Sequence, residues 1–392
     1  MFLAKDPLQF AMCGDSGNLS PYAAVQSLNC QRILLLINSG KTSASDIALK
    51  LRLTERDVNN ELEQLRTRGL INETDGKVSP AFPIFALKDQ RLMENVIEGL
   101  SRDIANVIQR RMGEVENLIE GLSLSKRRLR YPDMHYILVG AMTLDYNGLR
   151  VLKEEKLLCP MKPMPGGGNY VFSGLESGFA DVRKGWMWGH NSGFGEYWFS
   201  SHGRLPKGFR MAFPDLAWKW TEQVGQTSVV KEMEKIGQIL EILSHEDLSL
   251  PNLKAKTGRT NDLLMQLTVL LGLGYVVLVG EKWRINRPFF TVDDLHKIQK
   301  TSESILGTIA ELLETNRRTM LEVYAQTSPS KNKIPFEEAF NPLYHRIFEQ
   351  ALDQLIREKA FNPPLRYTNG SYSPFVAVGI ENLLNMLGIS TP

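Results

Sequence analysis

The chain has few cysteines, no long apolar run and almost no net charge. Its 392 residues include three cysteines, Cys13, Cys30 and Cys159, which are too far apart for a metal site and are typical of a reducing compartment. No stretch of about 18 uncharged apolar residues occurs, so we expect neither a membrane span nor a signal peptide. The formal charge is only +2, so any binding to nucleic acid has to come from local patches. These absences predict a cytoplasmic protein without membrane contact.

Signatures of catalysis and of metal binding are also missing. The loop Pro165-Gly166-Gly167-Gly168 lacks the lysine of a phosphate-binding loop. Ser201 and His202 are adjacent, whereas a catalytic triad is assembled from distant residues. His190, Glu196 and His202 do not form an established metal motif. The sequence therefore predicts no enzyme, no cofactor and no metal.

Two long stretches of the sequence resemble each other. Residues 31–176 recur in diverged form at 236–381, with a shift of 205 positions that later changes by two. Matched pairs include Leu62 with Leu267, Gly69 with Gly274, Val78 with Trp283, Pro83 with Pro288 and Lys126 with Lys331. A chance match would not keep its register so far, and each copy of a long repeat is usually one structural unit. The sequence predicts an internal duplication, a pseudo-dimer fused in one chain.

The first copy carries the pattern of two helices joined by a tight turn and followed by a hairpin. Ser45 is expected near the start of the first helix, and Thr54 is the expected N-cap of the second. The apolar residues of the second helix share one face at helical spacing: Val58, Leu62 and Leu65. Gly69 ends this helix, and Asp75-Gly76 favours the positive φ angles of a β-hairpin.

This order resembles the winged helix-turn-helix domain of transcriptional regulators of the ArsR and MarR kind. The resemblance is carried by TSASDIALKLRLTERDVNNELEQLRTRGLI and the TDGK hairpin after it, and covers about residues 31–85. The second copy keeps the order in LSLPNLKAKTGRTNDLLMQLTVLLGLGYVVLVGEKWRI. There Thr257 or Thr260 is expected to open the second helix, Gly274 to close it and Gly280-Glu281 to form the hairpin tip. This copy is more apolar, so we expect its second helix to be buried.

The resemblance implies contacts with double-stranded DNA. In such domains the second helix enters the major groove, and the hairpin, or wing, contacts the backbone. The residues expected to contact DNA in the first copy are Thr54, Glu55, Arg56, Asn59, Asn60 and Lys77. Those in the second copy are Arg259, Thr260, Asn261, Lys282 and Arg284. Glu55 and Asp57 oppose the phosphate field, and winged helices also serve as protein-interaction modules.

Five of the six tryptophans lie between Glu176 and Val230, a stretch with no counterpart in the second copy. Ligand pockets are usually apolar and edged by a few polar groups. The residues expected to bind a small-molecule or peptide effector are therefore Trp186, Trp188, His190, Trp198 and His202. The alternative is that these tryptophans fill the core of a small sheet, because large aromatic side chains usually bury for packing.

The expected fold is mainly α with α+β parts. It comprises a duplicated winged helix-turn-helix domain, a long helix after each copy, and an aromatic-rich α+β domain that includes a strand at HYILVGAMTLD. The expected boundaries are an N-terminal segment 1–30, winged helix 31–88, long helix 89–125, aromatic-rich domain 131–230, winged helix 231–290, long helix 291–327 and a shortened copy of the aromatic-rich domain at 335–392.

The expected function is sequence-specific DNA binding in transcription regulation, controlled by an effector that favours one spacing of the two units. The long helices carry apolar stripes that need a partner helix, so the chain is expected to act as a monomeric pseudo-dimer or as a homodimer. The alternative is an interaction scaffold that uses winged helices without binding DNA.

Overall fold

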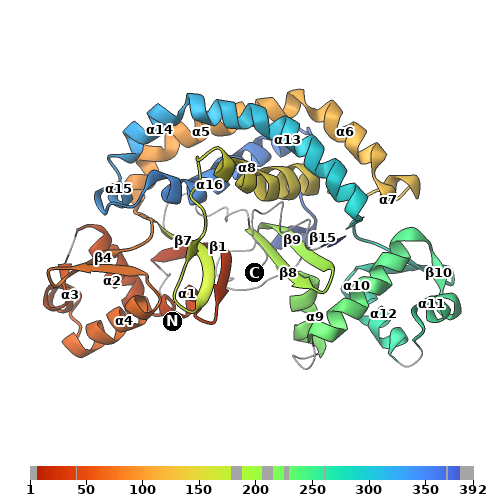
Figure 1. Ribbon diagram of the computed structural model, residues 1–392, viewed down its shortest axis with the longest axis horizontal. Coiled ribbons are helices and arrows are strands. Elements are labelled where there is room, and N and C mark those ends of the chain that lie inside the picture. Colours follow the sequence, from red (N-terminus) through yellow and green to blue (C-terminus); the bar gives the residue numbers. More distant parts are fainter. Residues whose placement is uncertain are drawn as a thin grey trace. The chain divides into compact units, whose positions relative to one another are not determined.

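The chain folds into two compact units, each assembled from three separate stretches of sequence. In the computed structural model, residues 7–40, 42–177, 188–204, 215–224, 229–259, 262–367 and 370–379 are described. The first unit joins 1–101 with 152–184 and 310–347, and the second joins 102–151 with 185–309 and 348–392. Helices and strands occur in both units (Figure 1), which agrees with the expected mixed α+β class. Among the described residues, no helix has the length and apolar character needed to cross a membrane.

The first unit contains three helices and a hairpin, which we call the first motif. It runs α2 (Leu28–Asn38), β2 (Thr42–Ser43), α3 (Ala44–Leu51), α4 (Glu55–Thr67), β3 (Ile71–Thr74) and β4 (Lys77–Pro80). Thr54 caps α4 as expected, because its hydroxyl accepts a hydrogen bond from Asp57 N at 3.1 Å. Ser43 caps α3, so Ser45 lies in the first turn, near the start of the helix as expected. Asp75 and Gly76 have positive φ angles and form the expected hairpin turn.

A four-stranded sheet completes the core of the first unit. Its order is β1 (Leu8–Gly17), β7 (Gly167–Glu176) and β5 (Ile84–Phe85), and β6 (Lys162–Pro163) also pairs with β7. β1 runs antiparallel to β7, whereas β5 runs parallel to it. Buried residues of the sheet, among them Tyr170 and Phe172, share one apolar core with α2, α4 and the short helix α1 (Pro21–Ala24).

The second unit contains the same order of elements, which we call the second motif. It runs α10 (Val229–His245), β10 (Leu248–Ser249), α11 (Leu250–Thr257), α12 (Leu263–Gly272), β11 (Val276–Val279) and β12 (Lys282–Ile285). Thr257 therefore ends α11 and does not open α12, which follows Asp262. Thr260 lies outside the described residues. Gly274 and Gly280 adopt positive φ at the end of the helix and at the hairpin tip.

The second sheet has the order β13 (Phe289–Phe290), β15 (Gly370–Val378), β9 (Tyr197–Arg204) and β8 (Trp188–Phe194), with β14 (Arg366–Tyr367) also paired to β15. β15 is parallel to β13 and antiparallel to β9, as β7 is to β5 and β1. β9 therefore takes the place in this sheet that β1 takes in the first. The tryptophan-rich stretch that lacked a counterpart in sequence supplies this strand, and α9 (Leu216–Val224) packs beside it.

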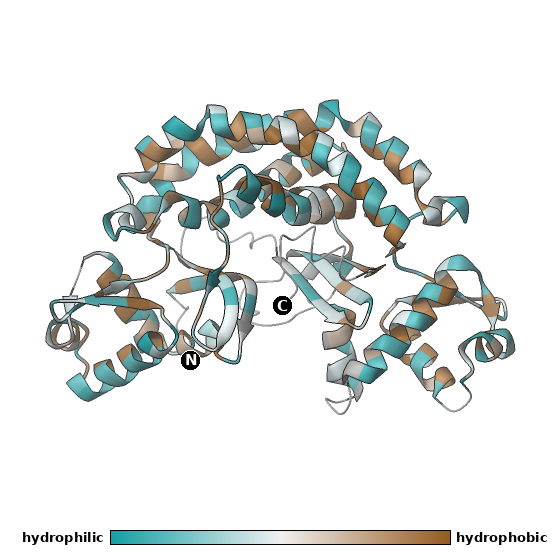
Figure 2. Cartoon of the chain, viewed as in Figure 1, coloured by the Kyte–Doolittle hydropathy of each residue, from teal (hydrophilic) through white to brown (hydrophobic). Residues whose placement is uncertain are grey.

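Long helices follow each motif. They are α5 (Leu87–Arg110) and α6 (Met112–Gly121) after the first, and α13 (Val292–Thr315) and α14 (Arg317–Tyr324) after the second. Figure 2 shows hydrophobic and hydrophilic residues alternating along them, as the sequence pattern predicts. Short helices α7 (Ser123–Lys126) and α15 (Ser328–Lys331) come next, and α16 (Phe336–Arg357) follows α15.

The strand expected at HYILVGAMTLD is wrong. Tyr136–Asn147 forms a π-helix, η1, which continues into α8 (Gly148–Glu154). All twelve of its residues are buried, so the apolar run has no polar face that would reveal a helical period.

Two fully buried aspartates join distant parts of the chain within each unit. In the first unit Asp89 accepts hydrogen bonds from Ala86 N at 2.9 Å and from Ser328 N at 3.0 Å. In the second unit Asp294 accepts from Thr291 N at 3.0 Å and from Ser123 N at 2.8 Å. Each carboxylate thus satisfies free N–H groups at the starts of two helices. The start of each long helix is thereby tied to the short helix that follows the other long helix.

We expect Asp294→Ala to lower the free energy of unfolding by about 3 kcal/mol, because it leaves buried N–H and hydroxyl groups without an acceptor. Asp293→Ala is the matched control, since Asp293 is exposed and its carboxylate pairs with Lys297 of the same helix. Urea titration followed by circular dichroism measures both variants. Equal stability of the two variants would contradict the role assigned to Asp294.

Candidate functional site

The first motif presents a polar helix face to solvent. Of the residues expected to contact DNA, Thr54, Glu55, Arg56, Asn59 and Asn60 are all exposed at the N-terminal half of α4, and Lys77 is exposed on β4. The side chains of Arg56, Asn59 and Asn60 have no hydrogen-bond or ion-pair partner within the described part of the chain. They lie at spacings of three and four residues, so they share one side of the helix. The structure thus places Arg56, Asn59 and Asn60 on one side of α4 with their donors and acceptors free, whereas Asp57 engages the Thr54 hydroxyl.

Other basic residues of the first motif are engaged internally. Arg66 pairs with Glu63 at 2.5 Å and with Glu73 at 2.9 Å. Arg68 donates to Ser20 O at 3.1 Å and to Gln64 Oε1 at 2.9 Å. The cations of this motif that remain free for an external phosphate therefore include Arg56 and Lys77.

Two of the five residues of the second motif that were expected to contact DNA, Arg259 and Arg284, form hydrogen bonds within the motif. Arg259 donates to Gln238 Oε1 at 2.6 Å, which ties it to α10. Arg284 donates to Asp247 Oδ2 at 2.7 Å. Burial raises the pKa of Asp247, but hydrogen bonds and charge from Arg284 and Arg127 outweigh burial and leave it below its usual value. Lys282 is exposed at the start of β12, and Thr260 and Asn261 lie outside the described residues.

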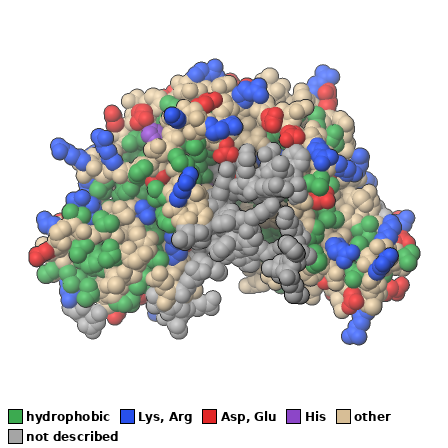
Figure 3. All heavy atoms as spheres, turned by 180° about the vertical axis from the view of Figure 1, so that it is seen from behind, with side chains coloured by type: hydrophobic (Ala, Val, Ile, Leu, Met, Phe, Trp, Pro, Cys, Tyr) green, Lys and Arg blue, Asp and Glu red, His purple; other side chains and the backbone are tan. Residues whose placement is uncertain are grey.

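The helix α12 presents an apolar face in place of a polar one. It contains no charged residue. One side of α12, with Leu263, Leu267 and Leu270, is buried. The other side is exposed to solvent, so the expectation that the whole helix is buried is wrong. We call the exposed apolar residues of α12 and β11 the apolar face: Leu264 (52%), Met265 (45%), Leu271 (42%), Leu278 (50%) and Val279 (47%). In Figure 3 hydrophobic side chains gather over the second motif, at the left.

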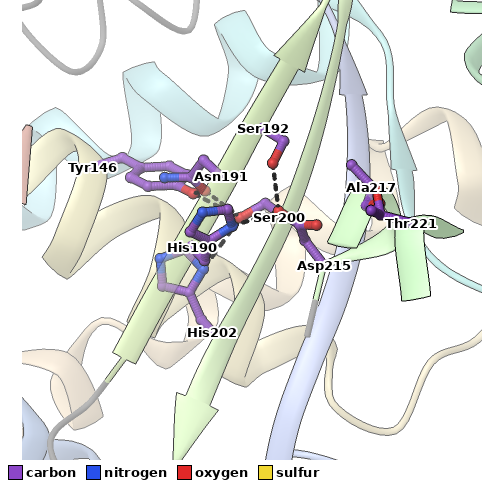
Figure 4. Close-up of polar contacts among 9 residues, drawn as sticks. All are labelled: Tyr146, His190, Asn191, Ser192, Ser200, His202, Asp215, Ala217 and Thr221. Carbon is purple, nitrogen blue, oxygen red and sulfur yellow. Dashed lines mark hydrogen bonds and ion pairs between the residues drawn. The ribbon is translucent and has the colours of Figure 1, made fainter. Parts of the chain in front are cut away.

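A buried polar cluster lies on one side of the second sheet. His202 Nε2 is hydrogen-bonded to Asp145 Oδ2 at 2.8 Å, and Nδ1 lies 3.3 Å from Ser200 Oγ. The Ser200 hydroxyl lies 2.6 Å from Tyr146 OH and donates to Asn191 Oδ1 at 2.7 Å. Figure 4 shows Tyr146 of η1 directed toward these strand residues. Gly189 is required here, because a β-carbon would overlap His202 Nε2 and lie 3.1 Å from Asp145 Oδ2.

His190 belongs to the opposite side of the same sheet. Gly189 is paired with His202 and His190 with Ser201, so the two histidines point to different faces. His190 Nδ1 is 2.5 Å from Asp215 Oδ2, and Ser192 donates to the same oxygen at 2.7 Å (Figure 4). The expected convergence of His190 and His202 on one ligand is therefore wrong.

The tryptophans of the expected pocket have different surroundings. Trp198 is 8% exposed and shares the sheet face of His202, beside Tyr146. Trp220 of α9 is 1% exposed and lies in the apolar core of the second unit. Trp186 lies outside the described residues, as does the side chain of Trp188 on β8.

The order Asp145, His202, Ser200 is the order of a catalytic triad, but the cluster is closed. Ser200 and His202 are fully buried, and the Ser200 hydroxyl is hydrogen-bonded to Asn191. A nucleophile has to reach a substrate carbonyl, which this packing prevents. Nor do the described histidine, cysteine, aspartate and glutamate side chains form a group of three that would hold a metal. Sequence reasoning missed Asp145, Tyr146 and Asp215, because no local motif marks them.

Comparison of the chain with protein-family models, curated proteins and solved structures finds no match.

We expect the His202–Asp145 pair to stabilise the second unit through direct coupling. Asp145→Ala is predicted to lower the free energy of unfolding by about 3–5 kcal/mol, because it removes the partner of a buried polar ring. A double-mutant cycle with His202→Ala isolates the pair, and the coupling energy should exceed about 1 kcal/mol. Additive effects of the two substitutions in urea unfolding would contradict direct coupling.

Proposed function

We propose that the chain binds double-stranded DNA in a sequence-specific manner through α4 of the first motif and acts in transcription regulation. The observation that carries this proposal is the set of Arg56, Asn59 and Asn60, exposed on one side of an N-capped helix with their hydrogen-bonding groups free. Arginine pairs bidentately with guanine and asparagine with adenine in the major groove. The N-terminal half of such a helix is the part that reaches base edges.

The charges around α4 limit the strength of this interaction. Glu55 is exposed in the first turn of α4, and Asp75 is exposed at the wing tip. Because affinity for DNA rises with the number of phosphates that lysine and arginine neutralise, a motif with few free cations gives weak nonspecific binding. Discrimination among sequences then depends mainly on base contacts.

The second motif favours a second function, binding to a protein. A DNA-contacting helix needs polar side chains and nearby cations, whereas α12 has no charge and carries the apolar face. Exposed apolar patches mark protein interaction sites in soluble proteins. This function differs from that of a scaffold without DNA binding, because it is restricted to the second motif and is compatible with DNA binding by the first.

We expect Arg56→Ala to weaken binding to the preferred DNA sequence by about 1–3 kcal/mol and to relax the preference, because a bidentate base contact is lost. Arg66→Ala is the matched control on the same helix, since Arg66 is engaged by two glutamates. The preferred sequence is first selected from random duplexes at stated salt, and affinities are measured by gel-shift titration. Absence of salt-sensitive binding by the parent protein to any duplex would end the DNA proposal and leave the scaffold.

The two wing lysines are expected to differ. Lys77 and Lys282 are both exposed first residues of the second wing strand in their motifs. Lys77→Ala should weaken binding to all duplexes alike and should reduce the slope of affinity against salt concentration by about one phosphate contact. Lys282→Ala should leave the affinity and the slope unchanged. Fluorescence anisotropy over several salt concentrations compares the variants. An equal loss in both would show that the second motif also contacts DNA.

A further inference from the structure

The apolar face of the second motif occupies positions that are polar in the first motif. The two motifs share backbone bonds, since Gly69 N donates to Arg66 O at 2.9 Å and Gly274 N donates to Leu271 O at 3.0 Å. Their hairpins also share one register, because β3 pairs with β4 as β11 pairs with β12. The five apolar residues therefore match polar ones: Leu264 with Asn59, Met265 with Asn60, Leu271 with Arg66, Leu278 with Glu73 and Val279 with Thr74.

The buried side of the helix is the same in both motifs. Three apolar residues are buried in each helix, namely Val58, Leu62 and Leu65 of α4 and Leu263, Leu267 and Leu270 of α12. On the exposed side of the first motif, Arg66 forms an ion pair with Glu73 at 2.9 Å. The framework therefore accepts charged side chains at these positions. Folding does not explain why α12 is apolar on its exposed side.

No charge interrupts the apolar face along α12, because this helix contains no charged residue. Thr268 is exposed between Leu264 and Leu271, and its hydroxyl donates to Leu264 O at 2.7 Å within the helix. Gly272 follows on the same side, where a β-carbon would meet no described atom within 4 Å. A partner can therefore cover this side of α12 without burying a charge or an unpaired side-chain donor.

The strand β11 lies at the edge of its sheet. The order of this three-stranded sheet is β10, β12, β11, so β11 pairs with β12 on one side and with no described strand on the other. Its four residues, Val276–Val279, are all aliphatic. Exposed edge strands usually carry a charged residue that prevents further pairing, as β3 of the first motif does at Glu73. An apolar edge without such a charge favours the addition of another strand.

The size of the apolar face suits a reversible contact. Its five side chains are 42% to 52% exposed. Together they present on the order of 400 Å² of apolar surface, which is typical of an interaction patch. Two such faces with their rims bury on the order of 1,000 Å², at the low end of specific interfaces, whereas obligate partners bury about 2,000 Å² or more.

A second copy of this chain supplies the surface that the face requires. An uncharged apolar surface is complementary to another of the same kind, and each copy carries one of equal size. The hairpin tip beside the face carries charges of both signs, Glu281 and Lys282, so two copies do not bring together charges of one sign alone. An edge strand also pairs antiparallel with its own copy about a twofold axis.

We propose that the apolar face joins two copies of this chain about a twofold axis, with α12 and β11 of one copy against the same elements of the other. The assembly stops at two copies, because the matching positions of the first motif are polar. This inference rests on the proposed role of the second motif in protein binding and names its partner. It does not depend on DNA binding.

The test is analytical ultracentrifugation of the full chain without DNA, over a range of protein concentrations and at low and high salt. We expect a monomer–dimer equilibrium that does not weaken at high salt, because the contact is apolar and not ionic.

A double variant, Leu271→Arg with Leu278→Glu, transfers the ion pair of Arg66 with Glu73 to the matching positions of the second motif. It removes two side chains of the face and introduces a pair that the framework accepts in the first motif. It should raise the dissociation constant of the dimer about tenfold or more. Leu49→Asn is the matched control, because Leu49 is 79% exposed outside the face, and it should leave the constant unchanged.

A parent chain that stays monomeric at every concentration would overturn the proposal. So would a folded double variant that dimerises as tightly as the parent. Circular dichroism checks the fold, and if the double variant does not fold, Leu264→Asn decides, since Asn59 holds the matching position.

A photoreactive amino acid in place of Met265 separates this inference from the function on which it rests. In cells that make the variant, a cross-linked product of two copies of the chain supports the proposal. Cross-linking to a different protein alone would overturn the pairing of copies but leave protein binding by the second motif in place. Absence of any product would count against both.

Discussion

The buried carboxylates of Asp89 and Asp294 tie together segments that lie far apart in the sequence. Each is fully buried and accepts hydrogen bonds from the starts of two helices far apart in sequence. A buried carboxylate without donors is costly, so each unit is complete only when both helix starts are present. The start of α5 thereby holds α15, and the start of α13 holds α7. Each unit consequently needs residues from both halves of the chain, and neither half contains a whole unit.

Two units with the same element order carry different surfaces. In the first unit, the exposed side of α4 is polar, and Phe82, which corresponds to Arg287 of the second unit, lies in an apolar core. In the second, α12 is apolar outside and the corresponding interior is polar. The proposed DNA contact and the apolar face thus lie in different units. The framework is maintained by backbone pairing that tolerates either kind of side chain, which allows the two units to take separate roles.

Local chemistry made some elements predictable. Thr54 caps α4 and Asp75-Gly76 turns the hairpin, because a hydroxyl before a helix and a positive φ at a tight turn are needs of a few neighbouring residues. The predictions for η1 and α12 were wrong, because the burial of a helix depends on its tertiary contacts. η1 is buried on every side and mostly apolar, so its sequence shows no helical period and predicts a strand instead. The exposed side of α12 was expected to be buried, because leucines and a methionine normally are.

The sequence alone predicts the order of the elements in both motifs, the positions of the turns and the polar face of α4, since these depend on residues within a few positions of one another. The tertiary structure is needed to show which strands pair and which side chains meet. The pairing of β9 with β15 places the tryptophan-rich stretch in a sheet. The register of β8 against β9 places His190 and His202 on opposite faces of that sheet. Such contacts join residues far apart in the chain, and no local spacing specifies them.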